Sequence, residues 1–137
     1  MGYVSRQKYF EKCYVPSDDI ITIDTSEDFI DSTSYNLVKT IMLVAPIISQ
    51  SLFRFKFDIH CSGGATAKGQ IYRNGSIVGT EQSTVSVIYV TKTEDILTTS
   101  WAVGDTIQIY GKTSDPAHPA YFKNFTLCGV GSEFLNA

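Results

Sequence analysis

Cysteine and histidine are the residues of this 137-residue chain that could carry nucleophilic, redox or metal chemistry. A catalytic pair of Cys61 with His60 is excluded, because neighbouring residues of a strand point to opposite faces. Neither His60 nor His118 lies in an H-x-H or H-E-x-x-H arrangement, so a metal site would have to be assembled across the fold. We predict that both histidines are solvated surface residues. The chain is therefore expected not to be an enzyme, and to have no catalytic residue, no metal ligand and no cofactor.

The 3 cysteines leave at least one thiol that is unpaired or paired between chains. Cys13, Cys61 and Cys128 match no local zinc or redox motif. We predict that they are small buried hydrophobic residues, since free cysteine is among the most buried residue types. The alternative is a disulfide between Cys61 and Cys128, both of which fall near the ends of predicted strands.

Acidic residues gather between positions 18 and 31. Oxygen-rich loops of this kind can hold calcium, but the spacing is not that of an EF-hand loop and no glycine occupies the required turn. We expect a solvated acidic edge, which discourages edge-to-edge pairing of sheets, and calcium binding stays open as the alternative. The acidic residues are Asp18, Asp19, Asp24, Glu27, Asp28 and Asp31.

Aromatic and basic residues are interleaved in the first 16 residues of the chain, a segment that Pro16 closes. A free segment of this composition would expose an apolar stripe, which monomers usually avoid, and tyrosine and arginine are enriched at protein interfaces. We predict an arm that packs on a neighbouring subunit near its acidic edge; the alternative is an arm that folds back on its own sheet. The candidate residues of this assembly arm are Tyr3, Arg6, Lys8, Tyr9, Phe10, Lys12 and Tyr14.

A second kind of binding would use exposed aromatic side chains as stacking platforms for sugars. Tyr72, Tyr110 and Tyr121 are the candidates for such a glycan site. Against this hypothesis, the chain has 1 tryptophan, and Trp101 lies beside a predicted turn where burial is expected.

Charge and hydropathy exclude two classes of partner. The formal net charge is −3 and the pI is about 5.2, so the chain lacks the basic field that nucleic-acid binding requires. No apolar run approaches the length of roughly 18 residues that would span a bilayer, so we expect no membrane insertion. The first eight residues lack the apolar stretch of a signal peptide. We expect a protein that is used without export, or one whose signal has been replaced by Met1.

The elements that must position these residues are strands. Residues 52–61 alternate without a fault: Phe53, Phe55, Phe57, Ile59 and Cys61 point to the core, and the charged residues between them point out. Asn74-Gly75 predicts a type I′ hairpin, because that turn needs positive φ at both central residues. The further strands expected are 20–25, 35–44, 65–73, 76–80, 85–91, 106–110 and 120–128, the last with a bulge. Residues 92–96 are predicted to form a short helical turn, and 101–105 a tight turn.

These elements predict an all-β fold, a two-sheet antiparallel sandwich of the jelly-roll type with about eight strands. We divide the chain into an N-terminal arm (1–16), a β-sandwich domain (17–128) and a C-terminal tail (129–137). The small inner residues of 65–71 indicate close approach of the opposite sheet or of a large neighbour such as Trp101.

Three segments follow one another in a recognisable order: 71–80 (IYRNGSIVGT), 101–110 (WAVGDTIQIY) and 120–125 (AYFKNF). They predict a strand with an N-G hairpin, then a G-D turn, and then a last aromatic strand. This order resembles small jelly-roll domains of phage and archaeal-virus structural proteins. The resemblance implies a virion structural protein, such as a minor capsid, decoration, turret or fibre-head subunit. Such a protein would be made in the host cytoplasm and act by homo-oligomer assembly and contacts with other virion proteins. A carbohydrate-binding module with a surface glycan as its partner is the alternative, and a small hydrolase ranks last.

Overall fold

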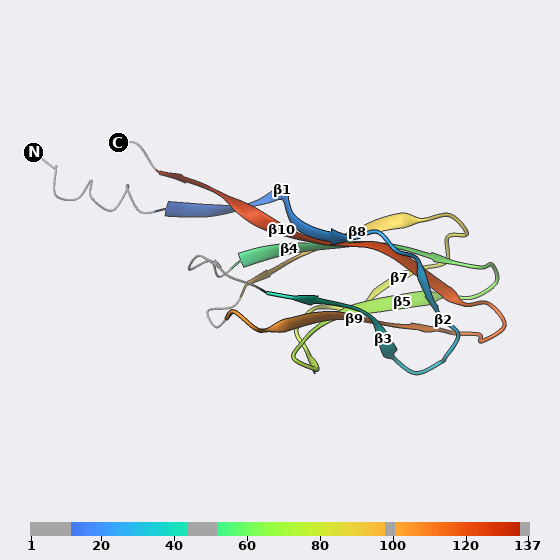
Figure 1. Ribbon diagram of the computed structural model, residues 1–137. Coiled ribbons are helices and arrows are strands. Elements are labelled where there is room, and N and C mark those ends of the chain that lie inside the picture. The colour runs from blue at the N-terminus through green and yellow to red at the C-terminus, as the bar shows by residue number, and fades with distance from the viewer. Residues whose placement is uncertain (1–11, 44–51, 98–100, 135–137) are drawn as a thin grey trace, which may run out of the picture.

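The computed structural model describes residues 12–43, 52–97 and 101–134, and in these residues every regular element is a β-strand. The strands form two antiparallel sheets that lie face to face as two layers (Figure 1). Sheet A holds β1 (Lys12–Asp24), β2 (Asp28–Ile30), β10 (Ala120–Phe134), β4 (Leu52–Cys61) and β8 (Val90–Leu97). Sheet B holds β3 (Asn36–Met42), β9 (Thr106–Thr113), β5 (Ala67–Arg73), β6 (Ser76–Ile77) and β7 (Gln82–Thr84).

The topology is a jelly roll, as predicted. The two strands β1 and β2 lie along the same edge of β10, and β6 and β7 lie along the same edge of β5, so the strands fill eight positions. The chain passes to the other sheet at every step between these positions except the hairpin from β5 to β6.

The core confirms the alternation predicted for β4. Its five inward residues, from Phe53 to Cys61, are at most 2% exposed. They meet Ile71 of β5 and Ile107 and Ile109 of β9 from the opposite sheet, all completely buried. Burial of this kind is the main favourable term in folding a domain of this size.

Two glycines of sheet B leave room for aromatic rings of sheet A. A Cβ atom on Gly69 would lie 2.9 Å from Cε2 of Phe122, and a Cβ on Gly111 would lie 2.4 Å from Cζ of the same ring. The small inner residues expected in this region therefore make room for Phe122 and Phe57 rather than for Trp101. Trp101 instead packs edge-on against Phe53, with 5.4 Å between ring centroids.

Both predicted turns are confirmed. Asn74 and Gly75 have φ angles of 49° and 83°, and Arg73 pairs with Ser76, which leaves a two-residue loop. Gly104 has a φ of 93° in the turn before β9. The predicted bulge in the last strand is also confirmed: the register of β10 against β4 shifts between Lys123 and Thr126. This shift lets Phe122 and Phe125, three residues apart, both point into the core.

The predictions for 85–96 are wrong except at residues 90 and 91, which are strand as expected. Residues 85–89 form no strand, and the predicted helical turn at 92–96 lies within β8, which pairs with β4. The inward positions of β8 include Lys92 and Glu94, which lie opposite Phe57 and Phe55. Because these inward positions of the edge strand β8 are charged, its sequence lacks the alternation of apolar and polar residues that identifies a strand.

The predicted domain boundaries fall inside strands. Residues Lys12 to Pro16 of β1 pair with Val130 to Phe134 of β10, across the boundaries expected after residues 16 and 128. Figure 1 shows this paired end of β1 and β10 extending beyond the two layers. Among the described residues, no helix has the length and hydropathy needed to cross a bilayer.

Candidate functional site

The predicted assembly arm is described only in part. Tyr3, Arg6, Lys8, Tyr9 and Phe10 lie outside the described residues. Lys12 and Tyr14 belong to β1, opposite Phe134 and Ser132 of the same chain. The packing of this arm on a neighbouring subunit stays a prediction.

The thiols and imidazoles do not come together in a reactive arrangement. Cys61 and Cys128 are both buried, and neither forms a disulfide. The alternative of a disulfide between them is wrong, because they lie at opposite ends of the paired stretch of β4 and β10: Cys61 is opposite Ala120, and Cys128 is opposite Arg54. His118 shares a hydrogen bond of 3.1 Å between its Nδ1 and the carbonyl oxygen of Ser62, whereas His60 stacks on an aromatic ring. In the described part of the chain, no cluster of three or more histidine, cysteine or acidic side chains could hold a metal.

Part of the acidic stretch holds a buried lysine that sequence reasoning missed. Lys39 of β3 is 4% exposed, and its Nζ lies 3.3 Å from Asp24 and 2.8 Å from Asp28. The same ammonium donates to the backbone carbonyl and the hydroxyl of Ser26. The hydrogen bond that Asp24 accepts from the Ser26 side chain lowers the pKa of Asp24 below its ordinary value, and the nearby Lys39 ammonium lowers it further. Asp24 and Asp28 are therefore paired with an ammonium, not simply solvated.

The outer face of sheet A carries a row of rings that runs across the strands. Tyr121 of β10 lies opposite Phe29 of β2 on one side and His60 of β4 on the other. The rings of His60 and Tyr121 are stacked at 4.6 Å, and Tyr89 meets His60 edge-on at 4.4 Å. We call Phe29, Tyr121, His60 and Tyr89 the aromatic row. It contains Tyr121, one of the three predicted glycan platforms.

The outer face of sheet B brings the other two predicted platforms into contact. Tyr72 of β5 and Tyr110 of β9 lie 4.1 Å apart between ring centroids, and Tyr35, in the segment before β3, lies 6.5 Å from Tyr72. We call Tyr35, Tyr72 and Tyr110 the tyrosine face. Exposed apolar residues flank it on both sides, because Leu37 pairs with Tyr110 and Ile77 pairs with Tyr72.

Charged groups adjoin the tyrosine face along the same strands. Lys112 places its Nζ 4.5 Å from the centroid of the Tyr35 ring, and the Tyr35 hydroxyl donates to Glu81. Burial, followed by the hydrogen bond to Glu81, raises the pKa of Tyr35 above its ordinary value. That hydrogen bond and the nearby Lys68 and Lys112 lower the pKa of Glu81, so its carboxylate stays ionised at neutral pH.

A buried carboxylate fastens the ends of β5 and β9, the two strands that carry the tyrosine face. Asp105 is 8% exposed and accepts hydrogen bonds from Arg73 at 2.9 Å, from the Asn74 side chain at 3.0 Å and from the Ala102 amide at 2.8 Å. Burial raises the pKa of Asp105, but these donors outweigh it and leave the pKa below its ordinary value. These contacts hold the end of β5 against the start of β9.

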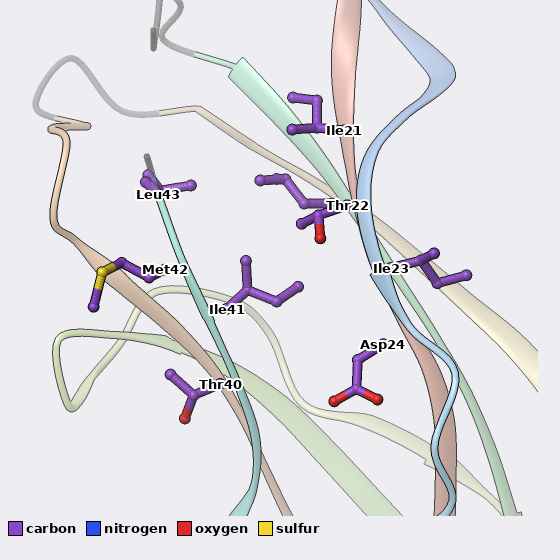
Figure 2. Close-up of a pocket in the computed structure, with 9 residues that line it drawn as sticks. Ile21, Thr22, Ile23, Asp24, Thr40, Ile41, Met42 and Leu43 are labelled. Carbon is purple, nitrogen blue, oxygen red and sulfur yellow. The ribbon is translucent and has the colours of Figure 1, made fainter. Parts of the chain in front are cut away.

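The third surface feature is a groove at the open edge of the sandwich, between β1 and β3. It has a volume of about 470 Å³. Residues 21–24 of β1 line one side, residues 40–43 at the end of β3 line the other, and Leu127 of β10 also contributes. Figure 2 shows Ile41 pointing from β3 toward β1, while Met42 points away from it. Ile21, Ile23 and Met42 are 53%, 43% and 57% exposed, so this edge is apolar and open to solvent. We call it the edge groove.

Comparison with known proteins gives no family. A scan of protein-family models finds no match, and a search of curated proteins finds none either. Among solved structures, the CBM22-1 xylan-binding domain of Xyn10C from Paenibacillus barcinonensis is 9% identical with a TM-score of 0.49, over 90% of this chain and 99% of that one. TmCBM61, solved in complex with β-1,4-galactotriose, is 12% identical with a TM-score of 0.38, over 81% and 90% of the two chains. Likenesses at this level carry no argument about function, and the expected kinship with virion proteins stays a prediction.

Proposed function

We propose that this chain is a glycan-binding β-sandwich module and that the tyrosine face is its binding surface. The observation that supports the proposal best is the contact between Tyr72 and Tyr110, which come from strands far apart in sequence and meet on one outer face. A sugar ring carries C–H groups on its faces and hydroxyls on its rim. It therefore needs an aromatic surface with hydrogen-bonding groups beside it.

The surroundings of the tyrosine face supply both parts of this requirement. The rings of Tyr35 and Tyr110 both lie near the ring of Tyr72, and the three together offer apolar area with polar hydroxyl tips. Lys68 and Lys112 lie further along β5 and β9 on the same face and offer donors, while the ionised Glu81 offers an acceptor. Tyrosine rings held on strands also lose little conformational freedom on binding, which favours affinity.

Affinity electrophoresis against a panel of soluble polysaccharides tests the proposal. The wild-type protein should be retarded by at least one polysaccharide, and Tyr110→Ala should weaken that binding roughly tenfold, the loss of a central aromatic contact. Tyr121→Ala, in the aromatic row of sheet A, is the matched control and should bind as wild type does. Retardation that is the same in wild type and Tyr110→Ala would overturn the assignment to the tyrosine face.

A second candidate function, the virion structural subunit expected from the sequence, is favoured by the edge groove. Two strands with exposed apolar residues, β1 and β3, flank this groove at the open edge of the sandwich. Such an edge is a template for association, and a second copy of the chain is the partner that a symmetric contact would use. The projecting pair of β1 and β10 would add contact area in the same region.

Light scattering after size-exclusion chromatography tests self-association. Under this second proposal the wild-type chain forms an oligomer, and Ile23→Glu, which places a charge in the edge groove, shifts it to a monomer. Ile77→Glu is the control, since Ile77 is also an exposed isoleucine, at 62%, and lies on another edge of the sandwich. A wild-type monomer at millimolar concentration would contradict this assembly role.

A further inference from the structure

Two lysines face each other on adjacent strands beside the tyrosine face. Lys68 of β5 and Lys112 of β9 are directly opposite in the antiparallel register. Like charges in this position repel and destabilise a sheet. One carboxylate offsets them: Glu81 lies 3.2 Å from Lys68 and 3.8 Å from Lys112. Two ammonium groups and one carboxylate leave one positive charge in excess, on a chain whose net charge is −3.

A small pocket opens between these lysines. It has a volume of about 180 Å³ and is lined by Lys68, Lys112, Thr33, Thr66, Thr113 and Ser114. Hydroxyl and ammonium groups therefore make up most of the polar lining, and the two ammonium groups and the hydroxyls of Thr33, Thr66 and Ser114 can donate hydrogen bonds to an oxyanion. The Thr113 hydroxyl donates instead to the backbone carbonyl of His118. The Ser114 Oγ accepts from the Thr66 amide at 2.8 Å, which fixes that hydroxyl beside the pocket and leaves its proton to donate.

The pocket adjoins the aromatic surface. Along β9, Lys112 follows Tyr110 by two residues and so lies on the same side of the sheet, about 7 Å further along the strand. Tyr35 joins the two regions, because its ring contacts Lys112 and lies near Tyr72, and its hydroxyl bonds to Glu81. A glycan that stacks one sugar on Tyr72 and Tyr110 would reach the lysine pair with the next unit of the chain.

We propose that the tyrosine face selects acidic glycans and that the anionic group of the sugar, a carboxylate or a sulfate ester, binds between Lys68 and Lys112. This inference rests on the proposed glycan-binding function and names its ligand class. The anion would neutralise the excess charge and take hydrogen bonds from Thr33, Thr66 and Ser114. Glu81 would keep its bond from Tyr35 and continue to hold the two ammonium groups in place.

Matched pairs of polymers test the inference by isothermal titration calorimetry. Polygalacturonate against its methyl ester isolates the carboxylate, and dextran sulfate against dextran isolates the sulfate ester. We expect at least one anionic polymer to bind roughly tenfold more tightly than its neutral counterpart, and the preference to shrink as salt is raised. Lys68→Gln and Lys112→Gln should each remove most of the preference. Lys123→Gln, a lysine on the outer face of sheet A, is the control and should keep it.

The outcomes separate this inference from the proposed function. Equal binding of neutral and anionic polymers that is lost in Tyr110→Ala would overturn the acidic selectivity and leave the glycan-binding face intact. Binding of anionic polymers that is lost in Lys112→Gln but unchanged in Tyr110→Ala would overturn the stacking face, because the chain would then be recognising charge alone. A preference retained in both lysine variants would contradict the placement of the anion.

Discussion

The two outer faces of the sandwich both carry aromatic clusters, but they differ in how their charges are matched. On sheet A, Arg54 binds Asp95 through two hydrogen bonds of 2.7 and 3.0 Å, and Asp58 accepts from Thr91 and Asn124. Lys123 lies over the ring of Tyr89 at 4.3 Å. Each of these charged groups thus has a partner within its own face, and the aromatic row is stacked internally.

On sheet B the matching is incomplete. Lys68 and Lys112 share the single carboxylate of Glu81, and a pocket opens between them. The tyrosines beside them are joined to this charged group through Tyr35. Both faces carry aromatic clusters, so aromatic content alone does not identify a binding face. On sheet B a pair of lysines that share one carboxylate and a small pocket both lie next to the rings, and these two features are the reason why we assign the proposed binding face to this sheet.

The largest expected effect is the difference in stability between a substitution in the core and one in the aromatic row. Phe122 and Tyr121 are neighbours on β10, but Phe122 is completely buried and Tyr121 lies on the outer face. Phe122→Ala should lower the free energy of unfolding by about 3–5 kcal/mol, whereas Tyr121→Ala should lower it by about 1 kcal/mol. Guanidinium unfolding measures both. Equal losses would show that the aromatic row supports the fold as strongly as the core does.

A smaller effect should distinguish the acid–base pairs of the two faces. Asp105→Asn should cost about 3 kcal/mol, because it removes a buried carboxylate that accepts from Arg73, Asn74 and the Ala102 amide. Asp95→Asn acts on a carboxylate that is 30% exposed and should cost less than about 1 kcal/mol. The folded-state pKa of Asp105 lies below the ordinary value of 3.8. Its contribution is therefore present above that value and is lost as the pH falls through the folded-state pKa.

Urea unfolding of wild type and Asp105→Asn at pH 7 and at pH 2.5 checks this prediction. The difference in unfolding free energy between the two proteins should be large at pH 7 and should shrink at the acid pH. A difference that is the same at both pH values would mean that the ionised carboxylate does not fasten the tyrosine strands.

The smallest expected effect tests whether the packing of the two sheets against each other influences glycan binding at the tyrosine face. Gly111 lies between Tyr110 and Lys112 on β9, and an added Cβ would meet the Phe122 ring of sheet A. Gly111→Ala should cost about 1–3 kcal/mol through overpacking and should also weaken glycan binding, because β9 has to shift. Gln108→Ala, on the outer side of the same strand, is the control for stability. If Gly111→Ala leaves both stability and binding unchanged, the tyrosine face does not depend on the close approach of the sheets.

The features that could be predicted from sequence are those encoded by neighbours in the chain. The alternation of residues 52–61 identifies the central strand, Asn74-Gly75 identifies the hairpin, and the broken pattern of 120–128 identifies the bulge. Strand β8 was missed because Lys92 and Glu94 occupy its inner side. Lys39 was missed because a register shift between Leu37 and Lys39 turns its side chain toward Asp24 and Asp28.

The candidate site could be predicted only as separate residues. Tyr72, Tyr110 and Tyr121 were all recognised as possible platforms, but their grouping depends on the pairing of β5 with β9, which brings together residues about forty positions apart. Without that register, Tyr121 could not be assigned to the opposite face, and the pairing of Lys68 with Lys112 could not be seen. No local pattern encodes such contacts, because they are set by the order of strands in the sheet.

We propose that the tyrosine face, and not the aromatic row, binds the glycan. Titration of isotope-labelled protein with a bound polysaccharide fragment, followed by amide chemical shifts in NMR spectra, tests this most directly. We expect shift changes concentrated in residues 68–72 of β5 and 108–112 of β9, with the amides of 56–60 and 121–123 unchanged. Changes concentrated in 56–60 and 121–123, or in the edge groove at 21–24 and 40–43, would contradict it.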